Sequence, residues 1–103
     1  MTEAGQVVST DPRTGEEVAR FPIADEAAVH AAVAAAEPAG AWWAGLGFAE
    51  RRRRMLRWRA LVTRRMTEAA RLLRAETGKP YADAVIELAV GIGDIDWAAR
   101  HAR

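Results

Sequence analysis

The sequence predicts a mainly α-helical chain with a short β-hairpin at its N-terminal end. Residues 6–23 carry strand-like segments on either side of a turn that contains proline and glycine. From residue 25 to residue 103, apolar side chains recur at helical spacing. Half of the 103 residues are hydrophobic and 28% are charged, which indicates a folded chain with room for one small domain at most.

The hairpin is centred on the turn that contains Pro12 and Gly15. Pro12 presets its own φ for a turn, and Gly15 can adopt a positive φ. The segment 17–21 then alternates polar and apolar side chains, as a half-buried strand does, until Pro22 stops it or confines it to a sheet edge. A lone hairpin is marginal in water, so we expect this one to pack on other protein.

The first helix is expected to begin after Asp25, which is a good N-cap. Its apolar stripe is thin because alanine buries little area, and it consists of Val29, Ala32, Val33 and Ala36. Pro38 lacks a backbone N–H, and Gly40 follows it closely. The sequence therefore predicts that the helix breaks or kinks at these two residues.

A second helix is predicted to begin near Gly47, where Glu50 favours the N-terminal dipole. A third helix, separate from the second or continuous with it, has an apolar stripe of Met66, Ala69, Ala70 and Leu73. Gly78 suits the left-handed position after a helix, and Pro80 suits the first turn of a fourth. Gly91 and Gly93 are expected to interrupt that fourth helix.

Charge is distributed unevenly along the chain. The net charge is +1, but residues 50–76 contain ten arginines against three glutamates, so the flanks are acidic. Such a chain can bind polyanions, or it can close on itself or on a partner domain. Because the arginines surround the helix instead of forming one stripe, a solvated or ion-paired helix face is the preferred interpretation. A nucleic-acid binder is the weaker alternative.

The composition and the N-terminal residues limit which covalent links, metal sites and cellular locations the chain can have. The chain has no cysteine, which excludes disulfides and thiol-ligated metal sites and suits the cytoplasm. The first residues lack the pattern of a signal peptide, and no apolar run is long enough to span a bilayer. His30 and His101 lack the spacing of metal ligands. We therefore expect a cytoplasmic protein without a membrane or nucleic-acid partner.

Three motifs occur in a fixed order. They are the turn Asp11-Pro12-Arg13-Thr14-Gly15-Glu16, a helix opened by Glu50-Arg51, and Glu76-Thr77-Gly78-Lys79-Pro80 followed by a helix that carries Glu87. An Ala-rich helix with a nearby tryptophan, residues 29–43, lies between the first and second. In this combination the chain resembles the opening segment of the NAD(P)-dependent aldehyde dehydrogenases, over nearly its whole length.

The resemblance implies that the chain is the N-terminal piece of an α/β fold. Residues 1–103 would be a partial domain, with the hairpin at 6–23 and helices over 25–103, that lacks most of the cofactor domain and all of the catalytic domain. The parent enzyme would oxidise an aldehyde to a carboxylic acid with NAD or NADP. Its nucleophilic cysteine, its base and its cofactor lysine would all lie downstream of Arg103.

It follows that this chain alone is expected to carry no catalytic residue and to bind no cofactor. Its expected partner is the rest of the dehydrogenase chain, in a parent that is a homo-oligomer. The alternative function is a stand-alone helical protein-interaction module or a degenerate remnant, which would use the same apolar helix faces to bind another protein.

One site is implied by the resemblance. Some family members hold a structural monovalent cation through backbone carbonyls, and the matching positions here are Ser9, Thr10 and Glu76. Carbonyl oxygens suit a hard cation. The alternative interpretation is that these three residues only end a strand and a helix.

Overall fold

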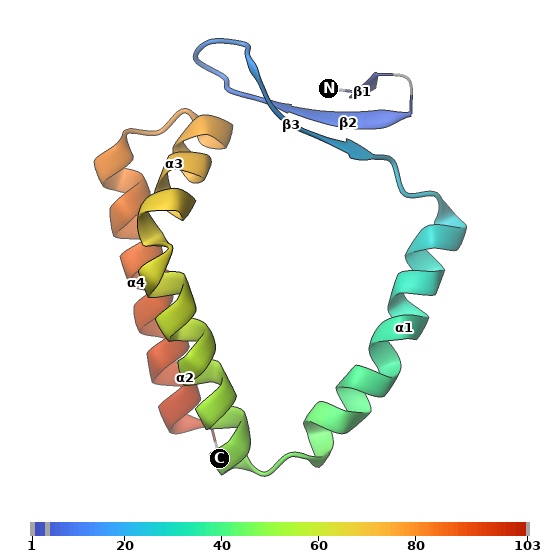
Figure 1. The fold of residues 1–103 in the computed structure, drawn as a ribbon, viewed down its shortest axis with the longest axis vertical. Coiled ribbons are helices and arrows are strands. Elements are labelled where there is room, and N and C mark those ends of the chain that lie inside the picture. Colours follow the sequence, from blue (N-terminus) through green and yellow to red (C-terminus); the bar gives the residue numbers. More distant parts are fainter. Residues whose placement is uncertain (1, 4, 103) are drawn as a thin grey trace.

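Strands and helices are arranged as an open frame in the computed structural model, which describes residues 2–3 and 5–102 (Figure 1). The elements in the described residues are β1 (Thr2–Glu3), β2 (Gln6–Thr10), β3 (Glu17–Pro22), α1 (Glu26–Gly45), α2 (Phe48–Arg64), α3 (Met66–Thr77) and α4 (Tyr81–His101). The prediction of a mainly α-helical chain with an N-terminal hairpin is confirmed.

The hairpin consists of β2 and β3, which pair antiparallel with Val7 opposite Phe21 and Ser9 opposite Ala19. The two-residue strand β1 adds to the other edge of β2, so the sheet has the order β1-β2-β3. The register is irregular between Ser9 and Thr10, just before the turn. Such an irregularity increases local twist, and here it leads the chain into the turn that meets α3.

Helix α1 begins as predicted, because the Asp25 side chain accepts a hydrogen bond from the Ala28 N–H at 2.8 Å. A break or a kink was predicted at Pro38 and Gly40. The break is wrong, because both residues lie inside a continuous helix of 20 residues. Pro38 leaves the Ala34 carbonyl without its helical donor. Because α1 is exposed along this stretch, water can reach that carbonyl, and the surrounding alanines favour the helix.

Helices α2 and α3 are separated by Arg65 alone. Its backbone has φ −98° and ψ 13°, and its N–H is shared between the carbonyls of Leu61 and Val62 at 3.1 Å each. Because Arg65 interrupts the helical conformation, the third helix is separate from the second, although only one residue joins them. Helix α2 begins after Gly47 as predicted.

In the turn between α3 and α4, Gly78 has the predicted position, and Pro80 lies one residue before the first turn in which it was predicted. Gly78 has φ +73°, and its N–H donates to the Arg74 carbonyl at 2.8 Å. Pro80 immediately precedes α4. The expected interruption at Gly91 and Gly93 is wrong, since α4 runs unbroken for 21 residues. Two glycines cost about 2 kcal/mol in a helix interior, and packing of α4 on α2 and α3 offsets that cost.

The frame encloses little core of its own. The buried hydrophobic residues in the described part of the chain are small, namely Val8, Ala70, Ala84 and Ala99. The Cα radius of gyration is 17.5 Å, against about 13 Å for a compact chain of this length. The accessible surface is 7594 Å², about a third above the roughly 5,700 Å² of a compact 11.2 kDa protein.

Helix α1 is the least covered element. It has no buried residue, and Figure 1 shows it apart from the layer formed by α2, α3 and α4. Large apolar side chains such as Phe21, Val33 and Trp42 are more than half exposed. None of the described helices is long and apolar enough to cross a membrane. The frame therefore has the surface of a structure that is completed by other protein.

Candidate functional site

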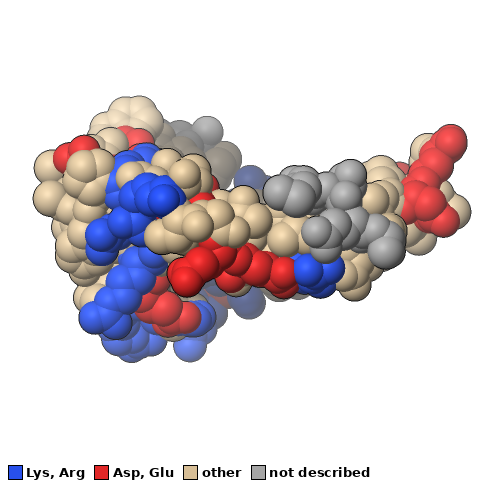
Figure 2. Space-filling model, turned by 90° about the horizontal axis from the view of Figure 1, so that it is seen from above, with Lys and Arg blue, Asp and Glu red and all other residues tan. Residues whose placement is uncertain are grey.

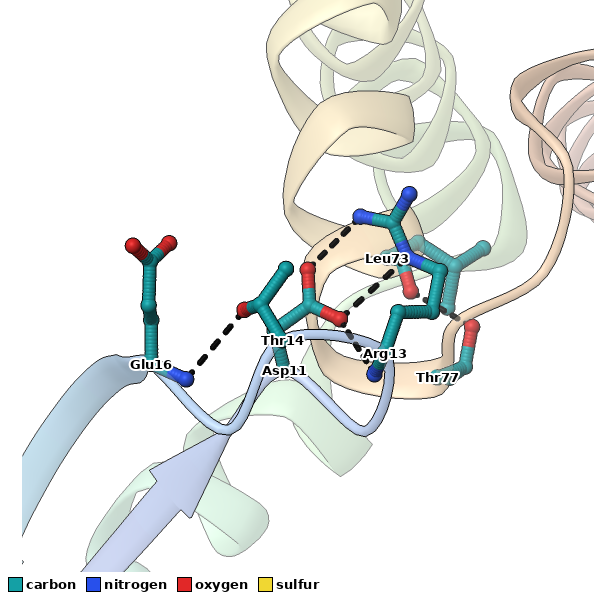
Figure 3. A network of polar contacts seen from close by, with 6 residues as sticks. All are labelled: Asp11, Arg13, Thr14, Glu16, Leu73 and Thr77. Carbon is teal, nitrogen blue, oxygen red and sulfur yellow. Dashed lines mark hydrogen bonds and ion pairs between the residues drawn. The ribbon is translucent and has the colours of Figure 1, made fainter.

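The hairpin turn is held rigid by its own side chains (Figure 3). The Asp11 carboxylate accepts a hydrogen bond from the Arg13 backbone N–H at 2.8 Å, and the Arg13 guanidinium donates to both of its oxygens at 3.2 and 2.6 Å. The Asp11 carbonyl accepts from the Gly15 N–H at 2.7 Å. The hydrogen bonds from the Arg13 side chain and backbone hold the pKa of Asp11 below its ordinary value.

This turn lies against the end of α3, which joins two motifs that are far apart in the sequence (Figure 3). A Cβ atom added to Gly78 would lie 2.9 Å from Pro12 Cγ and 3.4 Å from Arg13 Cγ. Gly78 is therefore required twice, for its positive φ and for the close approach of the turn. The motifs Asp11–Glu16 and Glu76–Pro80 form one structural unit.

Two of the three residues of the candidate cation site meet at this junction. Ser9 Oγ donates a hydrogen bond to Glu76 Oε1 at 3.0 Å. Thr10 is the last residue of β2, next to the nearly buried Asp11. The oxygen atoms of these side chains and of the backbone are hard donors, which fit an alkali-metal cation better than a transition metal. The described residues contain no group of three His, Cys, Asp or Glu side chains that could hold a metal ion.

A second junction, between α1 and α2, was missed from the sequence. The Arg51 guanidinium donates to the carbonyls of Trp43 and Ala44 at 3.0 and 2.6 Å, so it caps the C-terminal end of α1. The Arg54 guanidinium lies over the Trp42 ring, 4.9 Å from its centroid. The signal in the sequence is a basic residue a few positions after a helix end, where free carbonyls need donors.

Most of the remaining ion pairs stay within or between the helices of the α2–α4 layer. Asp96 of α4 pairs with Arg59 of α2 and, at 2.9 Å, with Arg100 of its own helix. Lys79 pairs with Glu87, which lies nearly two turns into α4. Five of the ten arginines between residues 50 and 76 have protein partners, namely Arg51, Arg53, Arg54, Arg59 and Arg65. Figure 2 shows most of the visible basic atoms on the side of the molecule that carries these helices.

The carboxylate of Glu50 has a strongly lowered pKa. Arg53 donates two hydrogen bonds to it at 2.7 and 2.8 Å, and Arg54 Nε lies 2.8 Å from Glu50 Oε1. These cations lower its pKa from 4.5 to about 2. Hydrogen bonds from arginine also lower the pKa of four other carboxyl groups, those of Asp11, Glu17, Glu68 and Asp96.

Acid is therefore expected to destabilise the frame. A carboxylate whose pKa is lower in the folded state stabilises the fold above its unfolded pKa and loses that contribution as the pH falls. For Glu50 the loss runs from about pH 4.5 towards pH 2. The midpoint of thermal unfolding, followed by far-UV circular dichroism, should fall across this window. The variant Glu50→Gln should show a shallower dependence, and an equal slope for both proteins would contradict the assignment.

Two shallow grooves lie on the helical layer, each with a volume of about 300 Å³. One is lined mainly by apolar side chains of α2 and α3: Trp58, Leu61, Val62, Ala69 and Leu72, with Arg65 and Glu68 at its edge. The other lies where Trp43, Phe48, Met55 and Ala99 approach one another. Neither groove contains the nucleophile and base that covalent catalysis needs.

Comparison with known proteins places these features in a family. The model of the aldehyde dehydrogenase family matches residues 1–103. A 3-sulfolactaldehyde dehydrogenase of Pseudomonas putida is 40% identical over 94 residues, which cover 91% of this chain and 19% of the relative. An N-succinylglutamate 5-semialdehyde dehydrogenase of Caulobacter vibrioides is 42% identical over 84 residues, 82% of this chain and 18% of the relative.

A third relative covers slightly more of the sequence. The glutarate-semialdehyde dehydrogenase of Pseudomonas putida is 35% identical over 100 residues, which are 96% of this chain and 21% of the relative. The chain thus spans about a fifth of the length of the curated relatives that it matches.

Proposed function

The chain belongs to the aldehyde dehydrogenase family, and we propose that it is the N-terminal scaffold segment of an enzyme that oxidises an aldehyde to a carboxylic acid. The observation that carries this proposal is the joining of the two family-like motifs through the close contact of Pro12 with Gly78. The hairpin, its turn and the α3–α4 corner are joined into one structural unit. The frame as a whole exposes large apolar side chains. Its role is to support the rest of the dehydrogenase, in a parent that forms a homo-oligomer.

The chemistry is assigned to residues outside this chain. NAD or NADP accepts the hydride when it is bound to such an enzyme. A dinucleotide is usually held at the turn between a parallel strand and the helix that follows it. The strands of the described residues are antiparallel neighbours, and β3 leads into α1 without a Gly-rich turn. These residues do not fit a dinucleotide, so the cofactor of the parent enzyme is assigned to its other domains.

The proposed contribution of this chain is therefore structural: it fixes the positions of its helices and its sheet relative to one another. Arg51 and Arg54 hold α1 at a defined angle to α2, and the Pro12–Gly78 contact fixes the sheet on α3. The same junction is where we propose the monovalent cation, held by backbone carbonyls of Ser9, Thr10 and Glu76. A cation there would tie the end of β2 to the end of α3. The absence of cysteine suits a reducing compartment, so we assign the parent enzyme to the cytoplasm.

Two measurements test this function. The purified 103-residue chain should reduce neither NAD nor NADP in the presence of a semialdehyde, because it holds no thiol. The coding frame beyond the codon for Arg103 should continue into a cofactor domain and a cysteine, and the native mass should match that longer protein. Aldehyde oxidation by these residues alone, or a native mass equal to 11.2 kDa, would overturn the proposal.

A further inference from the structure

Helix α4 has apolar side chains on two opposite faces. Ala84 and Ala99 are buried on the side that packs on α2 and α3. Ile86, Val90 and Trp97 lie on the other side and are 62%, 60% and 64% exposed, which makes them among the most exposed large apolar residues of the chain. A helix that is apolar on two sides is a middle layer, covered on both.

The outer side chains form one continuous seam. Ile86, Val90, Gly93 and Trp97 are separated by four, three and four residues, the spacing at which a helix presents a single line to a facing element. No heavy atom lies within 4 Å of the position that a Cβ of Gly93 would take. The backbone of a partner can therefore approach α4 closely at the middle of the seam.

One edge of the seam is acidic. Asp83 and Asp94 lie on the same side of it, three helical turns or about 16 Å apart at 1.5 Å per residue. Neither has a hydrogen bond or ion pair with another described residue, whereas Glu87 between them is paired with Lys79. A complementary surface would present apolar side chains and two basic groups at that separation.

A second copy of the chain, packed antiparallel on this seam, fits it poorly. Two α4 helices packed antiparallel about a two-fold axis would bring their acidic edges to the same side, so that like charges face each other. The aligned relatives are about five times as long as the matched segment, so most of the parent chain is available to cover α4. The surplus surface of the frame is roughly 1,900 Å², about twice what one partner contributes to a stable interface.

We propose that the outer face of α4 docks against an apolar segment of the remaining dehydrogenase chain that carries two basic side chains about 16 Å apart. This inference rests on the proposed function. It assigns α4 to the interior of the assembled enzyme, with Ile86, Val90 and Trp97 as the contact residues and Asp83 and Asp94 as the charged edge. Helices α2 and α3 cover the opposite face.

The test is a chimera of the Pseudomonas putida 3-sulfolactaldehyde dehydrogenase in which residues 1–103 replace the matching segment. The variant Val90→Asp places a charge in the seam and should lower the activity that survives heating by at least about tenfold, since an unpaired charge is costly to bury. The control is Ala89→Asp, which adds the same charge about 100° around the helix. It should change the surviving activity less than about twofold.

A second variant tests the charged edge. At low salt, Asp94→Arg should lower the activity of the chimera that survives heating. At high salt this surviving activity should approach that of the parent chimera, because screening removes the repulsion that the arginine introduces.

The outcomes separate the two proposals. A parent chimera that is insoluble or inactive overturns the proposed function. An active chimera in which Val90→Asp and Ala89→Asp behave alike overturns the docking of α4 and leaves the function standing. If the isolated chain sediments as a dimer that Val90→Asp dissociates, the occupant is a second copy and the inference is wrong.

Discussion

Replacement of Gly78 by alanine is expected to lower the free energy of unfolding by about 2–5 kcal/mol. A left-handed backbone costs an L-residue about 1–2 kcal/mol, and overpacking typically costs a further 1–3 kcal/mol. Both penalties apply because Gly78 has φ +73° and its added Cβ would lie 2.9 Å from Pro12 Cγ. Urea unfolding of the 103-residue chain, followed by circular dichroism, measures the change.

Two other glycines make the result interpretable. Gly15 has φ +76° but open space around its Cβ position. Gly15→Ala should therefore lower the free energy of unfolding only by the cost of the left-handed backbone, about 1–2 kcal/mol. Gly91 lies in a helix with the same open space, and Gly91→Ala should stabilise the chain by roughly 0.5–1 kcal/mol. If Gly78→Ala costs no more than Gly15→Ala, the hairpin turn does not press on α3 in solution.

The second large effect is expected at Pro38, where alanine should stabilise α1 by about 3 kcal/mol. The gain arises because alanine supplies the N–H that the Ala34 carbonyl lacks and removes the clash of the proline ring. No residue of α1 is buried, so backbone propensity dominates its stability. Amide hydrogen exchange of residues 32–40 should slow markedly, and the helical circular dichroism should rise.

The neighbouring variant Glu37→Ala provides the comparison. It changes helix propensity by a few tenths of a kcal/mol at most and leaves the backbone hydrogen bonds intact. Exchange in α1 should therefore stay close to that of the parent chain. Similar exchange in Pro38→Ala and Glu37→Ala would show that contacts outside α1, and not its own backbone, hold the helix.

Local signals predicted the start and end of most elements correctly. Asp25, Gly47 and Gly78 stand at helix ends because capping depends on the residues immediately around them. The errors at Pro38 and Gly91 have one cause: propensity assigns a local cost, but the length of the whole helix and its packing decide whether that cost breaks it. The strand β1 has only two residues and no pattern to recognise.

Contacts between distant residues were beyond sequence reasoning. The two motifs around Pro12 and Gly78 were identified separately, yet their contact joins positions 66 residues apart. Arg51 was identified only as part of the Glu50-Arg51 motif that opens α2, although its partners are carbonyls of the preceding helix. Ser9 and Glu76 were paired through the family resemblance alone, and their direct hydrogen bond depends on how the hairpin meets α3.

The contact between Pro12 and Gly78 also sets an order of events during synthesis. The hairpin leaves the ribosome first, but the glycine on which its turn rests is added 66 residues later, about 3–13 s at 5–20 residues per second. During that interval the strands and α1 have no surface on which to settle. The local contacts of α3 with α4 form quickly once both exist, whereas the closure onto the hairpin spans a long loop and comes last. The nascent N-terminal arm is consequently the stretch most open to proteases and chaperones while the protein is being made.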